Sequence, residues 1–300
     1  EAEESHGEYG LARQRLGLNL DQAVIPPLEV LVEGERHHPL HFDGRPVDES
    51  ELFESVPEAR AENPHAVAVI VANRNYQAPV ADVEYAHRDG RAFREHITRS
   101  FGVRPGNVIL ASDATTGDLQ RIFGTKEQPQ GQLADYIRPQ MSDVYVYYTG
   151  HGAPALGSSE GGSPYLLPTD CDPQYVETNG YALSLLYRNL AKLPARSVTV
   201  VLDACFTGFH DQGSIYTGIS PVVPRVERPD HGLPNGTVFM SSAADQISSW
   251  YPRKRHGLFT YFFLSGIRGA ADEDGDDAIT VGELSRYLEE NVPYEARRLR

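Results

Sequence analysis

Short apolar runs alternate with longer amphipathic stretches from residue 63 to the C-terminus. Five of the runs are rich in β-branched residues and predict buried strands at residues 66–72, 108–110, 143–149, 198–202 and 237–240. Between and after them, the pattern predicts helices at residues 83–100, 133–141, 183–193 and 258–267. Alternation of this kind favours an α/β fold, in which helices cover both faces of a mostly parallel central sheet.

The segments outside this alternation differ in character. Residues 1–62 are acidic, contain a histidine-rich stretch at 37–41, and show one candidate strand at 28–32. We interpret them as an N-terminal extension or small lobe of unknown role, followed by one domain over residues 63–300. Residues 208–235 are rich in glycine, proline and charge without a period, which is typical of a functional or mobile loop.

Composition excludes several functional classes. The chain of 300 residues carries a formal charge of −15, whereas nucleic-acid binding needs a basic surface. No apolar stretch approaches the ~18–20 residues that cross a bilayer, so we expect no membrane span. The sequence begins with Glu1 and shows no signal peptide, which leaves the localisation open and is compatible with a processed secreted or periplasmic protein.

A cysteine and a histidine each follow a predicted strand. Strand 198–202 runs into Asp203 and Cys205, and strand 143–149 ends just before His151, which has a glycine on each side. The carboxyl ends of neighbouring parallel strands meet at one edge of a sheet, so thiol and imidazole would lie side by side. A catalytic thiol needs such a partner, and the backbone N–H groups of Gly152 and Cys205 could form an oxyanion hole. A structural thiol and a loop histidine are the alternative, which the pairing of the two disfavours.

These segments resemble a known family. Tyr-Thr-Gly-His-Gly at 148–152 and Asp-Ala-Cys-Phe-Thr-Gly at 203–208 resemble the two catalytic boxes of the caspase–metacaspase clan of cysteine peptidases. Weaker similarity extends over roughly residues 65 to 295, at 71–76, 86–93, 101–103, 165–170 and 257–262. The resemblance implies a caspase-like three-layer α/β/α sandwich, with Cys205 as nucleophile, His151 as its partner and an acyl-enzyme intermediate. It implies no cofactor for the chemistry and identifies no third, orienting residue.

The residues around the nucleophile predict the specificity. Asp203 lies two residues before Cys205 and thus on the same strand face. Metacaspase-like members carry Asp there and cleave after Arg or Lys, whose charge a carboxylate would bind. By the same resemblance, Asp170 is a candidate second wall of the specificity pocket. Ser-Trp-Tyr at 249–251 resembles the Ser-Trp-Arg loop of caspases, with Tyr251 in place of the arginine that binds a substrate Asp, and Trp250 is expected to line a neighbouring pocket.

Residues 272–283 match a calcium-binding EF-hand loop. Its ligands would be Asp272, Asp274, Asp276 and Glu283, and a helix is expected over residues 281–294. Asp277 stands where the loop normally has glycine, which weakens binding. The loop therefore predicts either a structural or regulatory Ca²⁺ site or a solvated acidic turn.

Three functions follow from these observations. The first is a metacaspase-type cysteine endopeptidase that acts on peptides or proteins after Arg or Lys, with self-cleavage near Arg225. The second is a catalytically quiet, calcium-responsive interaction module, which the intact pair of Cys205 and His151 disfavours. The third is a caspase-type peptidase specific for Asp.

Overall fold

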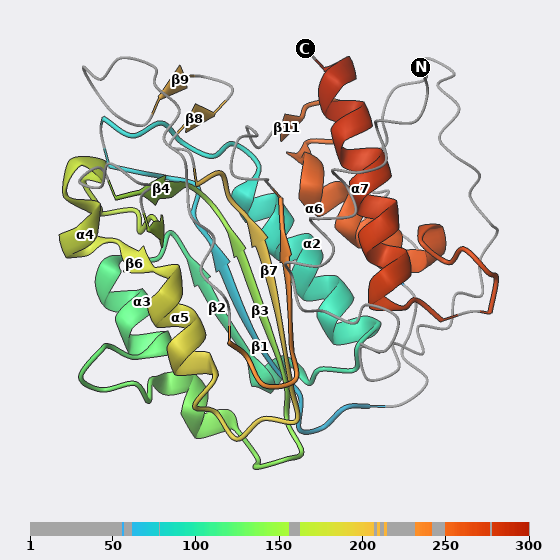
Figure 1. Cartoon of the computed structure of the whole chain (residues 1–300), viewed down its shortest axis with the longest axis horizontal. Coiled ribbons are helices and arrows are strands. Elements are labelled where there is room, and N and C mark those ends of the chain that lie inside the picture. The colour runs from blue at the N-terminus through green and yellow to red at the C-terminus, as the bar shows by residue number, and fades with distance from the viewer. Residues whose placement is uncertain are drawn as a thin grey trace, which may run out of the picture.

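The computed structural model describes residues 56, 62–77, 79–155, 163–206, 209–210, 213–214, 232–241, 250–276 and 278–299. The predicted strand at 28–32, most of the predicted loop at 208–235, and Arg225 lie outside these residues. In the described part, a central sheet carries helices on its two faces, as Figure 1 shows.

The central sheet has five strands, all paired in parallel, in the order β10-β7-β3-β1-β2. The strands are β1 (Val67–Ala72), β2 (Val108–Ser112), β3 (Asp143–Thr149), β7 (Ser197–Asp203) and β10 (Gly236–Met240). The chain moves from β1 to β2 on one side and then builds β3, β7 and β10 on the other. The strand order therefore reverses at β1, where open α/β sheets form a crevice at the carboxyl ends of their strands. All five strands predicted from the sequence are confirmed.

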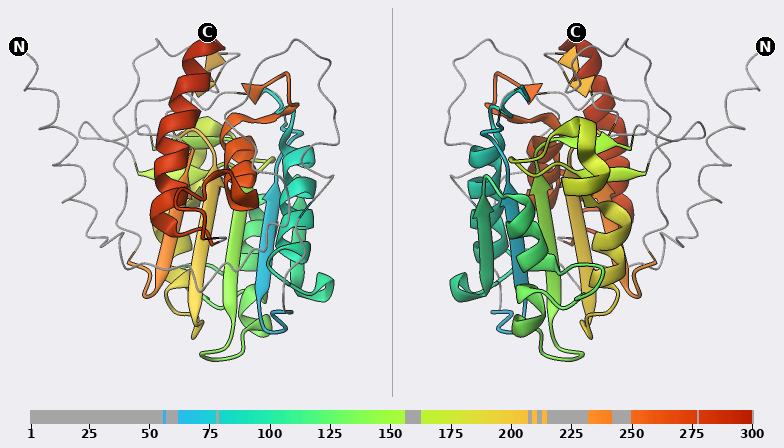
Figure 2. Two further views of the ribbon diagram at one scale, coloured as in Figure 1. Left: turned by 90° about the vertical axis from the view of Figure 1, so that its right-hand side faces the viewer. Right: turned by 90° about the vertical axis from the view of Figure 1, so that its left-hand side faces the viewer.

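The helices form the two outer layers. One face carries α3 (Thr116–Phe123) and α5 (Leu183–Leu190), and the other carries α2 (Ala86–Arg99), α6 (Leu258–Ser265) and α7 (Val281–Arg298). The two side views in Figure 2 bring each layer in turn to the front of the sheet. Alternation along each strand supplies both cores: Val200 packs with the first layer, and Val201 with the second. The predicted three-layer sandwich is confirmed.

Smaller elements surround the carboxyl edge of the sheet. Strands β4 (Gly152–Pro154), β5 (Pro164–Leu166) and β6 (Tyr181–Ala182) form an antiparallel sheet directly after β3. Two hairpins pair β8 (Phe209–His210) with β9 (Gly213–Ser214), and β11 (Trp250–Tyr251) with β12 (His256–Gly257). The remaining turns are the short helix α4 (Val176–Asn179), the 3₁₀ helices η1 (Pro105–Asn107), η2 (Gln132–Tyr136) and η3 (Pro173–Tyr175), and the π-helical η4 (Gly266–Ala270).

One predicted helix is wrong. The chain at 133–141 forms only the short η2, and Ile137 after it is extended. Pro139 disfavours helical backbone in the residue before it, which prevents a longer helix here. The helix that connects β2 to β3 is α3, which the sequence analysis missed; it begins with a capping box between Thr115 and Asp118.

None of the helices in the described part of the chain combines the length and the apolar character that crossing a membrane requires.

Candidate active site

His151 and Cys205 follow two strands that lie next to each other. Strands β3 and β7 pair in register up to Thr149 and Asp203, and Gly150 N donates to Asp203 O at 3.2 Å. His151 and Cys205 each stand two residues beyond this last pair, so the parallel register brings them to the same point of the sheet edge. Both are buried, with exposed fractions of 6% for His151 and 7% for Cys205.

The contacts of His151 define which ring nitrogen can accept a proton. Its Nε2 lies 2.7 Å from the backbone oxygen of Ala81, and since a carbonyl oxygen only accepts, Nε2 carries the hydrogen. In the neutral ring, Nδ1 is then the nitrogen that can take a proton from a thiol. The orienting group that the sequence did not reveal is thus a main-chain carbonyl, for which no residue type is a signal.

The backbone at Gly152 suits a role as an oxyanion donor. Leu167 N donates to His151 O at 3.0 Å, and Gly152 is the next residue in the β4–β5 ladder, opposite Leu166. Antiparallel ladders alternate, so the Gly152 N–H points away from β5. A Cβ at this position would lie 2.6 Å from the Phe206 ring and 3.0 Å from Cys205 O, which places the glycine backbone directly against the segment that carries Cys205.

Asp203 faces the helical layer formed by α2 and α6. Its Oδ2 accepts from Thr260 Oγ1 at 2.5 Å and from Thr260 N at 3.3 Å. A second buried carboxylate, Asp89 from α2, lies nearby: a methyl carbon placed on Gly257 would be 2.4 Å from Asp203 Oδ2 and 3.1 Å from Asp89 Oδ2. We call Asp89 and Asp203 the acid pair. The sequence analysis missed Asp89; the signal was an acidic residue in the first turn of an otherwise buried helix face.

The direct contacts of Asp89 are a backbone N–H and an imidazole, and the charges of Arg88 and Arg91 lower its pKa against the larger effect of burial. Gly257 N donates to its Oδ2 at 2.9 Å, and His256 Nδ1 contacts its Oδ1. Arg88 Nε donates to His256 Nε2 at 3.2 Å, so the hydrogen of the imidazole is on Nδ1 and points to Asp89. Burial, together with the charge of Arg88, lowers the pKa of His256 to about 3, and burial raises the pKa of Asp89 well above its usual range. Asp89 is therefore a buried carboxyl whose ionised form a nearby cation would favour.

Two other residues predicted for the specificity site have different surroundings. Asp170 Oδ1 accepts from Thr116 N at 2.8 Å and from Thr116 Oγ1 at 3.1 Å, at the start of α3. Trp250 is half-buried in β11, with its ring edge-on to Tyr85 at a centroid distance of 5.8 Å. Tyr251 is buried in the core and stacks on Phe262 at 6.3 Å.

The acidic loop before α7 brings three of its four predicted ligands together. One carboxylate oxygen from each of Asp272, Asp274 and Asp276 lies within 4.8 Å of the others. Glu283 is used differently: Oε2 accepts from Thr280 N at 2.8 Å and completes the capping box of α7, while Oε1 accepts from Glu273 N at 3.2 Å. Three carboxylates fit a hard cation, and Glu283 would have to release these bonds to join them. Asp277 lies outside the described residues.

Comparison with known proteins identifies the family and agrees with the observed fold. The family model of the caspase domain, a family of cysteine peptidases, matches residues 65–298. No curated protein sequence matches the chain. The structure is similar to that of caspase-1 from Spodoptera frugiperda, with a TM-score of 0.50 and 14% identity over 81% of this chain and 83% of that one. The chain therefore belongs to the caspase-domain family of cysteine peptidases.

Proposed function

We propose that this chain is a cysteine endopeptidase that cleaves peptide bonds after Arg or Lys. The observation that carries the specificity is the acid pair, two buried carboxylates that converge on a glycine next to the nucleophile strand. Both carboxylates lie at the same glycine, so a guanidinium or ammonium group of a substrate placed there would form charge-assisted hydrogen bonds with them. In this proposal Asp89 takes the role that the sequence suggested for Asp170, whose carboxylate is bonded to Thr116.

In the proposed reaction, the residues that follow β3 and β7 carry out the catalytic steps. His151 Nδ1 accepts the thiol proton, and Cys205 Sγ bonds to the carbonyl carbon of the scissile peptide. The N–H groups of Gly152 and Cys205 stabilise the negative charge on the carbonyl oxygen. The C–N bond then breaks, the amine leaves with the proton from His151, and a thioester remains. A water that gives its proton to His151 hydrolyses the thioester, and the thiol is restored.

The Asp-specific alternative has less support. The position at which caspases carry the substrate-binding arginine holds Tyr251, and its ring is packed among aromatic side chains. A buried phenol with its pKa raised to about 12 by burial offers no positive charge to an acidic substrate. The self-cleavage predicted near Arg225 would follow from the same specificity for Arg, and it stays a prediction.

The test is cleavage of fluorogenic peptides that end in Arg, Lys or Asp, with the Cys205→Ala variant as a blank. We expect turnover of the Arg and Lys peptides that disappears in this variant. Asp203→Asn and Asp89→Asn should each lower kcat/KM for the Arg peptide about 10- to 100-fold, because each removes a charge-assisted contact. Asp170→Asn is the matched control and should change it less than about twofold, within the range of surface substitutions.

Two results would refute the proposal. Preferential turnover of the Asp peptide would overturn the specificity, and folded wild-type protein without any Cys205-dependent turnover would favour the quiet interaction module. Loss of activity in Asp170→Asn but not in Asp89→Asn would show that Asp170, rather than Asp89, forms the second wall of the specificity pocket.

A further inference from the structure

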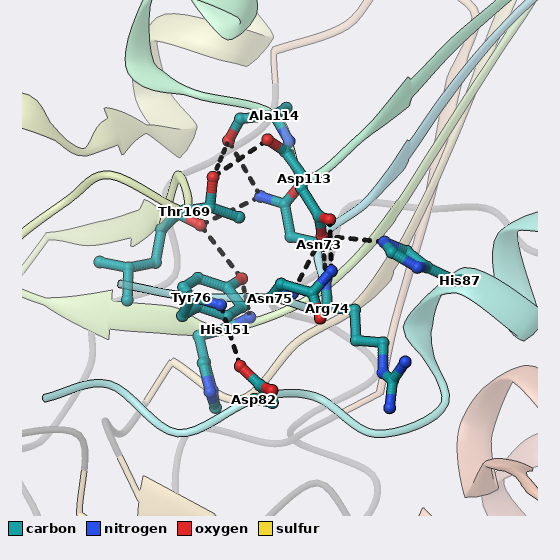
Figure 3. Close-up of polar contacts among 11 residues, drawn as sticks. Asn73, Arg74, Asn75, Tyr76, Asp82, His87, Asp113, Ala114, His151 and Thr169 are labelled. Carbon is teal, nitrogen blue, oxygen red and sulfur yellow. Dashed lines mark hydrogen bonds and ion pairs between the residues drawn. The ribbon is translucent and has the colours of Figure 1, made fainter. Parts of the chain in front are cut away.

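The loop that follows β1 contacts both the backbone and the ring of His151 through Tyr76. Tyr76 in this loop accepts a hydrogen bond from His151 N at 2.8 Å and donates one to Leu167 O at 3.2 Å. Its ring packs on the imidazole with a centroid distance of 4.7 Å and an interplanar angle of 55°. One buried side chain thus contacts both the backbone and the ring of the histidine, as Figure 3 shows.

The peptide units on both sides of His151 are fixed as well. Tyr148 Oη donates to His151 O at 2.7 Å, and Leu167 N donates to the same oxygen at 3.0 Å. Gly150 allows both phenols to come this close, because a Cβ there would lie 2.6 Å from Tyr76 Oη and 2.9 Å from Tyr148 Oη. Burial raises the pKa of both phenols, so they stay neutral and keep their hydrogen bonds at any working pH.

The Tyr76 loop is itself anchored by one carboxylate. Asp113, which follows β2, accepts from Arg74 N at 2.8 Å, from Asn75 N at 2.9 Å and from Asn75 Nδ2 at 2.7 Å. His87 Nε2 on α2 lies 2.8 Å from the same carboxylate. Burial alone would raise the pKa of Asp113, but these hydrogen bonds outweigh it and lower the pKa below its usual value. The carboxylate is therefore ionised, and it ties the loop to β2 and α2 (Figure 3).

We propose that Tyr76 is a positioning residue that sets the orientation of His151, and that Asp113 anchors the loop that carries Tyr76. This inference rests on the proposed peptidase activity. Tyr76 acts on the reaction through the imidazole and has no contact with the acid pair in the described contacts. Without its hydroxyl, the His151 N–H loses its hydrogen bond to Tyr76, and the residue can turn so that Nε2 leaves the Ala81 carbonyl and the imidazole loses its orientation.

Tyr76→Phe keeps the ring and removes the hydroxyl. We expect kcat to fall about 10- to 100-fold, since a displacement of about 1 Å in a catalytic group costs up to about 100-fold. KM should stay within about twofold, because the residues that bind the substrate side chain are untouched. The matched control is Tyr181→Phe, which removes another buried hydroxyl, one that donates to Gly124 O at 2.8 Å on the α3 side of the sheet.

A second readout does not depend on peptide turnover. Cys205 is alkylated with iodoacetamide over a range of pH, and the modified peptide is followed by mass spectrometry. A well-placed imidazole favours the thiolate, so the alkylation midpoint of Cys205 should move to higher pH in Tyr76→Phe and stay in place in Tyr181→Phe. Cys171 is an internal reference, because burial raises the pKa of its thiol to about 12.

Asp113→Asn tests the anchor and serves if Tyr76→Phe fails to fold. The new side-chain amide would place an N–H group against an N–H donor of the loop. As in Tyr76→Phe, we expect kcat to fall and the alkylation midpoint of Cys205 to move to higher pH. Wild-type kcat and alkylation in folded Tyr76→Phe would overturn the proposal, as would equal losses in Tyr181→Phe. If wild type cleaves no peptide, the proposed function fails, while the alkylation profiles of the two tyrosine variants still decide the positioning role.

Discussion

A single methyl group at Gly257 should block the proposed specificity site. Gly257 has φ −58° and ψ 136°, a conformation that alanine adopts without strain. The added carbon would lie 2.4 Å from Asp203 Oδ2, which is closer than non-bonded atoms allow, and 3.1 Å from Asp89 Oδ2, which is a tight contact. Gly257→Ala therefore pushes the acid pair apart and fills the space where a substrate cation would meet both carboxylates.

The size of the effect follows from what the substrate loses. A hydrogen bond to a charged group contributes about 1.5–3 kcal/mol, so kcat/KM for Arg and Lys peptides should fall about 10- to 150-fold. Overpacking should also lower the free energy of unfolding by about 1–3 kcal/mol. Alkylation of Cys205 should keep its wild-type pH dependence, because the change leaves His151 and its contacts in place.

The assay compares kcat/KM for peptides that end in Arg, Lys or a neutral residue, together with the midpoint of thermal unfolding. Gly266→Ala is the control for overpacking, since its Cβ would lie 2.6 Å from Leu284 Cδ1 in the core between α6 and α7. It should be destabilised to a similar extent and keep its preference for Arg. Folded Gly257→Ala with wild-type kcat/KM for the Arg peptide would refute the assignment of the acid pair as the specificity site.

Two further predictions concern stability. Burial lowers the pKa of His96 from 6.5 to about 4, so the unfolded chain takes up a proton first as the pH falls. The contribution of His96 to the free energy of unfolding should therefore decrease by about 3 kcal/mol between pH 6.5 and 4, and urea titrations should show a decrease smaller by about this amount in His96→Leu. For the acidic loop, we propose that Ca²⁺ binds at Asp272, Asp274 and Asp276; at a 100-fold excess over Kd it should stabilise the fold by about 2.7 kcal/mol and raise Tm by about 5–10 °C. Asp274→Asn should abolish this shift, and an unchanged Tm of wild type with Ca²⁺ or chelator would identify a solvated acidic turn.

The strands were predictable because most of their side chains are buried on both faces of the sheet, which requires continuous apolar runs. The run from Ser197 to Leu202 is β-branched almost throughout, and β7 begins and ends within one residue of the prediction. Helix α3 was not predicted, although its capping box of Thr115 and Asp118 is visible in the sequence. It is only eight residues long, and the apolar residues at 133–141 gave a stronger periodic pattern that Pro139 interrupts.

The position of the candidate site was predictable to the extent that His151 and Cys205 follow strand ends. His151 and Cys205 follow apolar runs directly, so the order of residues along the chain already places them at one edge of the sheet. The segment after β1 supplies the other groups of the site: Tyr76, the Ala81 carbonyl and Asp89. They meet His151 and Asp203 through contacts between distant parts of the chain, which the sequence pattern does not reveal. A main-chain carbonyl has no residue signature, and a tyrosine after a strand is ordinarily part of a core.

If the proposed function holds, specificity and rate depend on different residues, as expected from the alternation of side chains along β7. Asp203 points to the α2 and α6 layer, where it meets Thr260 and lies beside Asp89. The contacts that orient His151 come instead from the loop after β1 and from Leu167 after β5. The two sets share the sheet edge but no side chain. Substitutions around Gly257 should therefore change which peptide bond is cleaved, whereas substitutions around Tyr76 should change how fast any accepted bond is cleaved.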